Sequence, residues 1–301
     1  MTNGQGGALT RRATLAAAAG FGTVVFLNSP KAQAAPKTFV LVHGSWHGGW
    51  CWRRVSDRLE KLGHKVYTPT LTGLGERSHL LDEKVNLTTH ITDIVNVIKW
   101  ERLSNVVLCG HSYAGYPVSG ALEMIGSAVS SIVFLDSFLP DNGDSILEKG
   151  NPRVAESIRA AVEKKQLSLP PLPASFFQVN EADRAWVDSM CTPQPLGTYT
   201  EKLMLTGARE RVAKKTYIRA KGYSQPIFDA AEEKLKKDPT WRVLPVQSGQ
   251  QRVTVPGSGV HQRVPGRLVV PVDDRLARAG EVVATDQQRP QLCGQLGAGH
   301  T

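Results

Sequence analysis

The stretch that decides the fold is VVLCGHSYAGYP, which runs from Val106 to Pro117. Its first part, VVLCG, is a continuous apolar run and predicts a buried strand. The residues that follow, YAGYPVSGALEMIG, carry apolar side chains at helical spacing. Ser112 is therefore expected in a sharp turn between a buried strand and a helix, with its hydroxyl projecting at the carboxyl end of the strand.

This position predicts that Ser112 is a nucleophile. The turn places its hydroxyl near the free N–H groups of a helix N-terminus, which favour developing negative charge. Small neighbours suit a crowded turn, and Gly110 and Ala114 are both small, although the last position of the usual Gly-x-Ser-x-Gly pattern is alanine here. The alternative is an ordinary serine that caps the helix. The strand before Ser112 and the helix after it favour the nucleophile.

Further strands and helices alternate around this turn. Strands are expected at 38–44, 64–71, 130–136, 215–220 and 241–246, and helices at 50–63, 87–103, 113–126 and 227–239. Such alternation predicts an α/β fold with a doubly wound, mostly parallel sheet. Residues from about 140 to 212 interrupt the alternation with proline-rich loops and a helical piece at 151–167, which predicts a helical lid insertion. Thr88 or Thr89 is the expected cap of the helix over 87–103.

The loop after the first strand supplies a candidate oxyanion hole. In VHGSWHGGWCW, His43 and Gly44 make the turn, and the backbone N–H of Ser45 can then face the Ser112 site. The N–H of Tyr113, next to the nucleophile, is the second donor. Preorganised donors of this kind stabilise the negative charge of an acyl-transfer intermediate. The alternative is a plain glycine-rich connection with aromatic residues in the core.

Four separated segments, FVLVHGSWHGGWCW, LTGLGERSHL, VVLCGHSYAG and FLDSFLPDNG, together resemble the α/β-hydrolase superfamily. They are most similar to the branch that holds plant methylesterases, hydroxynitrile lyases and bacterial esterase relatives. The resemblance runs from about residue 38 to residue 246. It implies an eight-stranded sheet with a helical lid, and hydrolysis of a small ester by a serine, a histidine and an acid without a cofactor. Cleavage of a cyanohydrin is the alternative chemistry, but it needs a cation near the pocket that no lid residue clearly supplies.

The acid and the histidine are harder to place than the serine. Asp136 ends the strand over 130–136 and is the preferred acid, which would orient the histidine; a carboxylate that caps the next turn is the alternative. Asp229, the first carboxylate after the strand over 215–220, is expected on the surface of a helix. The family places its histidine in a Gly-His pair after the last strand, but Gln250 follows Gly249 here. Glutamine cannot act as a general base, so His261 is the substitute if the tail folds back.

Residues 251–301 differ in composition from the rest of the chain. They are rich in Gly, Pro, Gln and Arg, and no aromatic residue follows Trp241, which is typical of loops or disorder. We hypothesise that the tail from about Gln250 is the product of a reading-frame shift. Loss of one base from the codons CAR-CAR-CGN of residues 250–252 would begin the other frame with His-Asn or His-Ser. Without a histidine, the chain would be a catalytically impaired α/β-hydrolase that binds small apolar ligands.

Residues 1–34 are predicted to be a signal peptide. Arg11 and Arg12 precede an apolar run, Leu15 to Leu27, and Ala32-Gln33-Ala34 is a small-x-small cleavage pattern. The paired arginines resemble a twin-arginine (Tat) signal, so the Tat export machinery is the expected partner and the mature domain, about 35–250, is expected in the periplasm or outside the cell. A membrane anchor or a disordered tail is the alternative, although the apolar run is short for a stable span.

The composition of the 301 residues narrows the remaining possibilities. The net charge is +9, or 9 − 3 = +6 without the three basic residues of the leader. The other basic residues are scattered, so no nucleic-acid partner is expected. The four cysteines match no metal or disulfide spacing. The expected ligand is a small-molecule ester, and Phe176, Phe177, Trp186 and Met190 suggest an apolar acyl or aryl pocket, although they suit the core of a lid equally well.

Overall fold

The structure is a computed structural model that describes residues 35–222 and 224–247. The chain divides into two units, residues 1–34 and residues 35–301, and every described residue belongs to the second unit. The predicted signal peptide, Gly249, Gln250, His261 and the tail over 251–301 lie outside the described residues, so the predictions on them stay predictions.

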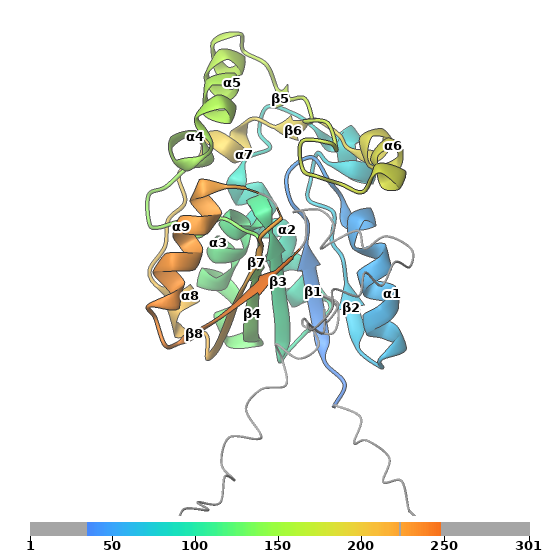
Figure 1. The fold of residues 1–301 in the computed structure, drawn as a ribbon, viewed down its shortest axis with the longest axis vertical. Coiled ribbons are helices and arrows are strands. Elements are labelled where there is room, and N and C mark those ends of the chain that lie inside the picture. Colours follow the sequence, from blue (N-terminus) through green and yellow to red (C-terminus); the bar gives the residue numbers. More distant parts are fainter. Residues whose placement is uncertain (1–34, 223, 248–301) are drawn as a thin grey trace, which may run out of the picture. The chain divides into compact units, whose positions relative to one another are not determined.

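Six parallel strands form the main sheet, in the order β2-β1-β3-β4-β7-β8 (Figure 1). Their bounds are β1 (Thr38–Val42), β2 (Lys65–Tyr67), β3 (Val106–His111), β4 (Val129–Leu135), β7 (Lys214–Ala220) and β8 (Trp241–Val246). The α/β class is confirmed. The main sheet of the described residues has six strands, whereas the resemblance implies eight.

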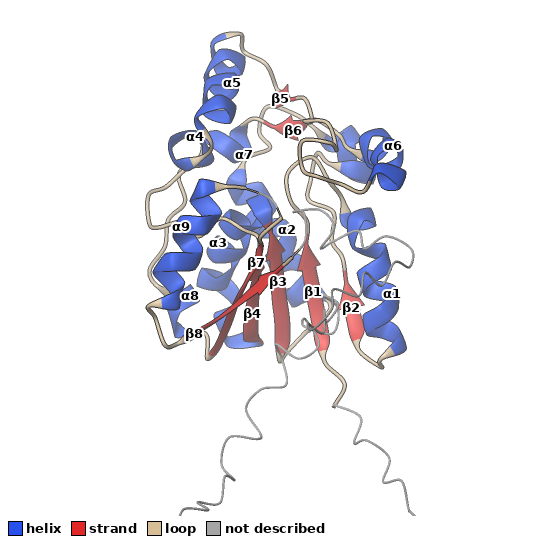
Figure 2. Cartoon of the chain, viewed as in Figure 1, coloured by secondary structure: helices blue, strands red, loops and turns tan. Residues whose placement is uncertain are grey.

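Helices cover both faces of this sheet (Figure 2). They include α1 (Arg53–Lys61), α2 (Leu87–Trp100), α3 (Gly115–Ile125) and α9 (Pro226–Lys236). In β1, Val40 and Val42 pack in the apolar cluster that contains α2 and α3, whereas Phe39 and Leu41 pack in the cluster that contains α1. Strand side chains alternate between faces, so a strand buried on both faces must be apolar throughout. This requirement explains the continuous apolar run that precedes Ser112.

The cap of α2 differs from the prediction. Asn86, rather than Thr88 or Thr89, is the N-cap, because its backbone is extended while the two threonines already lie inside the helix. The Oδ1 atom of Asn86 accepts a hydrogen bond from the N–H of Thr89 at 2.9 Å, and Thr89 Oγ1 accepts one from the N–H of Asn86 at 3.3 Å. This reciprocal pair is a capping box.

The chain between β4 and β7 forms a cover over the carboxyl ends of the strands (Figure 1). Its elements are α4 (Ile146–Lys149), α5 (Pro152–Glu163), β5 (Ser168–Leu169), α6 (Glu181–Met190), β6 (Gln194–Pro195), α7 (Gly197–Thr200) and α8 (Ala208–Arg211). Strands β5 and β6 pair with each other and not with the main sheet. No helix in the part of the chain that the structure describes is long and apolar enough to cross a membrane.

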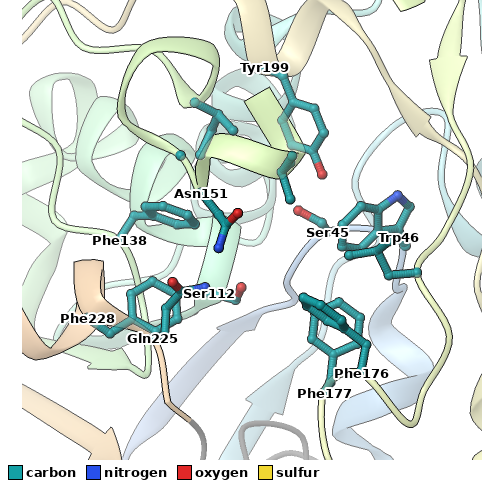
Figure 3. A pocket seen from close by; sticks show the side chains of 14 residues that line it. Ser45, Trp46, Ser112, Phe138, Asn151, Phe176, Phe177, Tyr199, Gln225 and Phe228 are labelled. Atoms are coloured by element: carbon teal, nitrogen blue, oxygen red, sulfur yellow. The ribbon is translucent and has the colours of Figure 1, made fainter. Parts of the chain in front are cut away.

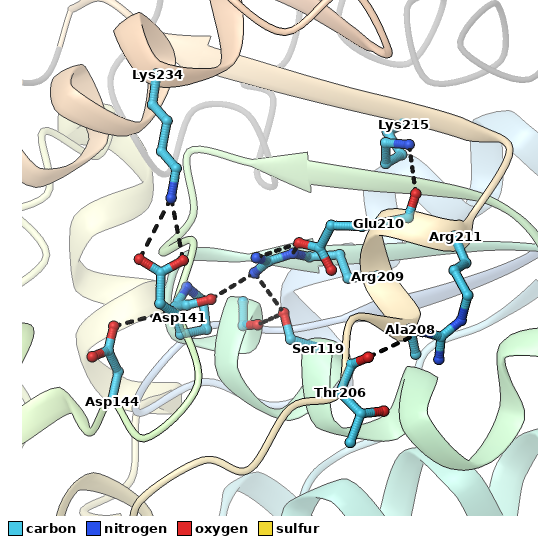
Figure 4. A network of polar contacts seen from close by, with 12 residues as sticks. Ser119, Asp141, Asp144, Thr206, Ala208, Arg209, Glu210, Arg211, Lys215 and Lys234 are labelled. Atoms are coloured by element: carbon cyan, nitrogen blue, oxygen red, sulfur yellow. Dashed lines mark hydrogen bonds and ion pairs between the residues drawn. The ribbon is translucent and has the colours of Figure 1, made fainter.

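A buried arginine ties both ends of this cover to the body of the fold (Figure 4). Arg209, at the end of the cover, donates to the carbonyl oxygen of Pro140 at its start, at 2.8 Å, and to Ser119 Oγ on α3 at 3.4 Å. Its guanidinium also pairs with the carboxylate of Glu210 at 2.7 Å. Lys215, on β7, donates to the backbone oxygen of Glu210 at 2.9 Å. The cover is therefore anchored beside α3, below the site.

Candidate active site

Ser112 lies in the turn between β3 and α3, as predicted. Its φ angle is +54°, in the left-handed region that residues other than glycine rarely adopt. The loop after β4 holds this backbone in place, because the N–H of Phe138 and the hydroxyl of Ser137 both donate to the carbonyl oxygen of Ser112, at 3.1 and 2.8 Å. A strained backbone fixed by its surroundings is typical of functional sites.

Two glycines let neighbouring segments approach this turn closely. A Cβ atom on Gly44 would lie 3.1 Å from the Cβ of Ser112, and one on Gly115 would lie 2.0 Å from the carbonyl oxygen of Phe138. The second distance is far below any normal contact, so the packing requires glycine at this position. The loops after β1 and β4 therefore close on Ser112 from two sides.

The loop after β1 brings Ser45 to the wall of the same cavity as Ser112 (Figure 3). Its shape is fixed by Trp46, which has a φ of +66°. The N–H of Trp46 donates to Gln194 Oε1 at 2.9 Å, and its indole N–H donates to the carbonyl oxygen of Leu169 at 3.2 Å. Both partners belong to the cover, so the cover braces the loop that carries the first predicted oxyanion donor.

Tyr113, the second predicted donor residue, is fully buried at the start of the turn into α3. Its hydroxyl is hydrogen-bonded to His90 Nδ1 at 3.0 Å, while His90 Nε2 donates to the carbonyl oxygen of Thr72 at 2.9 Å. Because the carbonyl can only accept, Nε2 carries the proton and Nδ1 accepts from the tyrosine. The tyrosine side chain is thus anchored away from the cavity, which leaves its backbone at the nucleophile.

Asp136 follows β4 at the same edge of the sheet. Its side chain is fully buried, and its Oδ1 atom accepts hydrogen bonds from Arg219 Nη1 at 2.6 Å and from the N–H of Ala220 at 3.0 Å. Its Oδ2 atom has no hydrogen-bond partner among the described residues. Burial raises the pKa of Asp136 to about 6, although the Arg219 guanidinium opposes the shift. The structure thus presents one free, buried carboxylate oxygen one strand away from Ser112.

Asp229 has a different environment. It lies on α9 with a side chain that is 43% exposed, and it pairs with Arg219 at 3.1 Å and with Lys221 at 3.4 Å. Lys221 also pairs with the buried Glu232. The prediction that Asp229 is a surface residue is confirmed, and its carboxylate is engaged in a chain of ion pairs outside the pocket.

Three described histidines, His43, His47 and His90, are engaged in structural hydrogen bonds. His43 contacts the carbonyl oxygen of Gly44 through Nδ1 at 2.8 Å, and its Nε2 atom accepts from the N–H of Leu71 at 3.0 Å. Burial lowers the pKa of His43 to about 3 and that of His90 to about 4. His47 binds the carbonyl oxygen of Ser45 through Nδ1 at 2.6 Å.

No histidine lines the cavity at Ser112 within residues 35–222 and 224–247. His261, the sequence candidate for this role, lies outside the described residues, as does Gln250, which stands where the family places its histidine. The structure therefore brings together Ser112, Ser45 and Tyr113, with Asp136 on the next strand, and does not test the histidine.

The cavity beside Ser112 encloses about 520 Å³, part of it open to solvent, and is mostly apolar (Figure 3). Its walls are Ser45, Trp46, Ser112, Phe138, Ile146, Gly150, Asn151, Val154, Leu172, Phe176, Phe177, Tyr199, Gln225 and Phe228. Phe176 and Phe177 line it as predicted. Trp186 and Met190 do not, because Trp186 packs against Trp50 at a centroid distance of 5.1 Å and Met190 is turned toward solvent.

The described residues offer no place for a metal ion: they contain no group of three or more His, Cys, Asp or Glu side chains with suitable geometry. Cys51, Cys109 and Cys191 are free thiols, and Cys293 lies outside the described residues.

Comparison with known proteins agrees with this geometry. A carbendazim hydrolyzing esterase from Nocardioides sp. (strain SG-4G) is 40% identical over 220 residues, which are 70% of this chain and 91% of that protein. Methylesterase 9 of Arabidopsis thaliana is 37% identical over 106 residues, 35% of this chain and 41% of the plant protein. The chain thus aligns with less than half of the plant relative.

The fold also matches solved structures. An extracellular alpha/beta-hydrolase from a Paenibacillus species superposes with a TM-score of 0.64 at 24% identity, covering 72% of this chain and 92% of that protein. At this identity the likeness shows the fold alone. The model of the alpha/beta hydrolase family matches residues 39–300. The chain therefore belongs to the alpha/beta hydrolase family, close to the plant methylesterases and the bacterial carbendazim esterase.

Proposed function

We propose that the chain is a serine hydrolase that cleaves small carboxylic esters through an acyl-enzyme on Ser112. The observation that carries the proposal is the left-handed backbone of Ser112 in a strand-to-helix turn that faces an apolar cavity. Esterase relatives support it, and the Nocardioides relative makes carbendazim a natural substrate to try.

The proposed reaction uses the groups around the turn in two half-reactions. Ser112 Oγ attacks the ester carbonyl carbon, and its proton passes to a general base. The N–H groups of Ser45 and Tyr113 stabilise the oxyanion. The carbon–alkoxy bond then breaks, and the alcohol leaves with the proton. Water attacks the acyl-enzyme in the same way, so that one ester and one water give one acid and one alcohol.

We assign the base to His261 and its acidic partner to Asp136. Strand β8 is parallel to β7, so the chain leaves Val246 at the same edge of the sheet as Ser112 and Asp136. The free Oδ2 atom of Asp136 is suited to accept the N–H of an imidazole and to stabilise the imidazolium that forms.

A catalytically impaired, ligand-binding hydrolase is the second candidate. It is favoured by Gln250, which stands where the resemblance places a histidine, and by a cavity whose described walls contain no histidine. Such a protein would bind small apolar esters in the same pocket without turnover.

We also propose that residues 1–34 direct export through the Tat machinery to the periplasm or the medium. The paired arginines Arg11 and Arg12 support this proposal. Replacing both with lysine should retain the protein in the cytoplasm of a Tat-competent bacterium, as judged by cell fractionation. Unchanged export would contradict it.

Hydrolysis of p-nitrophenyl acetate and butyrate by the full chain tests the function. The parent should turn over both esters, and Ser112→Ala should lower kcat by at least about 10³-fold. The exposed Ser127→Ala is the matched control and should change nothing. Loss of turnover in His261→Ala would identify the base, whereas an inert parent that gains activity with Gln250→His would establish the impaired hydrolase.

A further inference from the structure

A second cavity lies next to the cavity at Ser112. We call the cavity at Ser112 the active cavity and its neighbour the outer cavity. The outer cavity encloses about 650 Å³, part of it open to solvent, and its described walls come from α3, the loop after β4, α4 and α9. Phe138 is the one described residue that lines both cavities. The two spaces therefore meet at this side chain.

The ring of Phe138 is held between one aromatic residue of each cavity. Its centroid lies 5.8 Å from that of Tyr116, which lines the outer cavity, and 5.1 Å from that of Phe228, which lines the active cavity. Both neighbours are fully buried. Figure 3 shows Phe138 and Phe228 together on one side of the active cavity. The Phe138 ring is thus a partition between the two spaces.

The backbone of Phe138 is fixed as firmly as its ring. Its N–H donates to the carbonyl oxygen of Ser112 at 3.1 Å. Its own carbonyl oxygen lies so close to Gly115 that a Cβ atom there would be only 2.0 Å away. The partition is therefore tied to the turn that carries the nucleophile, and it cannot move aside without disturbing that turn.

Helix α9 shows how near the outer cavity is to the active cavity. Phe228 lines the active cavity, and Ala231, three residues later on the same helix, lines the outer cavity. An α-helix rises about 5.4 Å per turn, which is the length of roughly four carbons of an extended alkyl chain. Removal of the ring would therefore lengthen the active cavity by enough for roughly four more carbons.

The outer cavity suits an apolar chain better than a charged ligand. Its charged side chains are already paired, because Lys234 binds Asp141 at 3.2 Å and Lys149 binds Asp144 at 3.4 Å. Figure 4 shows the first of these pairs beside the outer cavity's Asp144. Between the pairs the walls are apolar side chains of α3, α9 and the loop after β4. Apolar walls bind alkyl groups by removing them from water.

We infer that Phe138 is the residue that limits the chain length of the ester, by closing the active cavity on the side of α9. This inference rests on the proposed ester site at Ser112 and names its substrate class, esters whose arm toward α9 is a short chain. A longer acyl or alkoxy arm meets the Phe138 ring, whereas without the ring the same arm enters the outer cavity.

Equilibrium binding to the full-length Ser112→Ala protein tests the partition without relying on turnover. Methyl butyrate and methyl octanoate compare a short and a long acyl arm, and butyl acetate and octyl acetate compare the alcohol arm. Isothermal titration calorimetry gives the Kd values. Adding Phe138→Ala should favour the long member of one pair over its short partner by at least about 10-fold more than before, because each further buried methylene group contributes up to about fourfold.

Three further variants in the same background show whether the gain comes from the outer cavity. Ala230 lines the outer cavity and not the active cavity, so Phe138→Ala/Ala230→Trp refills the outer cavity and should abolish the gain. Phe138→Leu leaves part of the partition in place and should give a smaller gain. Leu172→Ala is the control, because it enlarges the active cavity at a wall that the outer cavity does not share, and it should leave both ratios unchanged.

The inference fails if neither pair shows a gain in Phe138→Ala or Phe138→Leu, if the gain survives Ala230→Trp, or if Leu172→Ala gives an equal gain. The separate ester assay distinguishes this failure from failure of the proposed function. A chain that hydrolyses p-nitrophenyl esters without the gain keeps the function and loses the partition. A chain that shows the gain without hydrolysis keeps the partition and loses the function.

Discussion

Replacement of Arg219 by methionine should destabilise the protein in a strongly pH-dependent way. Arg219 is buried, with a side chain that is 1% exposed, and it binds Asp136, whose side chain is 0% exposed, at 2.6 Å. Removing one partner of a buried ion pair leaves the other charge without compensation. This typically costs about 3–5 kcal/mol of unfolding free energy.

The sign of the pH dependence follows from the pKa of Asp136. Burial already raises this pKa from 3.8 to about 6, and loss of the guanidinium moves it further up. When the pKa of a carboxyl group is higher in the folded state than in the unfolded state, the free energy of unfolding falls as the pH rises from the unfolded pKa to the folded pKa. Above the folded pKa it falls no further. In the parent the fall ends near pH 6, the folded pKa of Asp136. In Arg219→Met the folded pKa is higher, so the free energy of unfolding continues to fall above pH 6. Between pH 6 and pH 8 the variant should lose about 2–3 kcal/mol more than the parent.

Urea unfolding of both proteins at pH 5.5 and pH 8 measures this difference. The loss caused by Arg219→Met should be much larger at pH 8. The double variant Asp136→Asn/Arg219→Met is the control and should not show this additional loss at pH 8, because the carboxyl group of Asp136 is no longer there to titrate. An equal loss at the two pH values would refute the account of the Asp136–Arg219 pair.

Two further predictions test the packing of the turn and the state of its histidine. Gly115→Ala should lower the unfolding free energy by about 1–3 kcal/mol or more, because its Cβ would overlap the Phe138 carbonyl oxygen. Gly126→Ala is the control and should not, because the space around Gly126 is open. Equal stability of the two variants in urea would contradict this packing. Because burial lowers the His90 pKa from 6.5 to about 4, the unfolded state takes up the proton first as the pH falls below 6.5. The stability lost between pH 7 and pH 5 should therefore be about 2 kcal/mol smaller in His90→Gln than in the parent, and an identical loss would show that His90 does not titrate this way.

Local patterns predicted the fold and the position of Ser112 in its turn well. The apolar runs at 38–44 and 130–136 became strands β1 and β4 because residues buried on both faces of a parallel sheet must be apolar. Ser112 was found for a similar reason, since the strand, the turn and the helix that position it are continuous in sequence.

Side chains that converge from distant segments could not be predicted. Arg219 meets Asp136 only because β4 and β7 are neighbours in the sheet, and nothing in the strand around it marks that pairing. Gln225 and Asn151 face one cavity from two separate loops, and each reads in the sequence as an ordinary polar loop residue. The sequence left Trp186 open between the pocket and the lid core, because apolar character alone does not say which face of a lid helix meets the cavity.

The central claim is that Ser112 is a nucleophile in an ester-binding pocket. Covalent labelling with a fluorophosphonate, followed by peptide mass spectrometry of the full-length protein, tests it most directly. The account predicts one adduct, on the peptide that contains Ser112, and no adduct in Ser112→Ala. A folded parent that stays unlabelled, or a label that persists in Ser112→Ala, would contradict it.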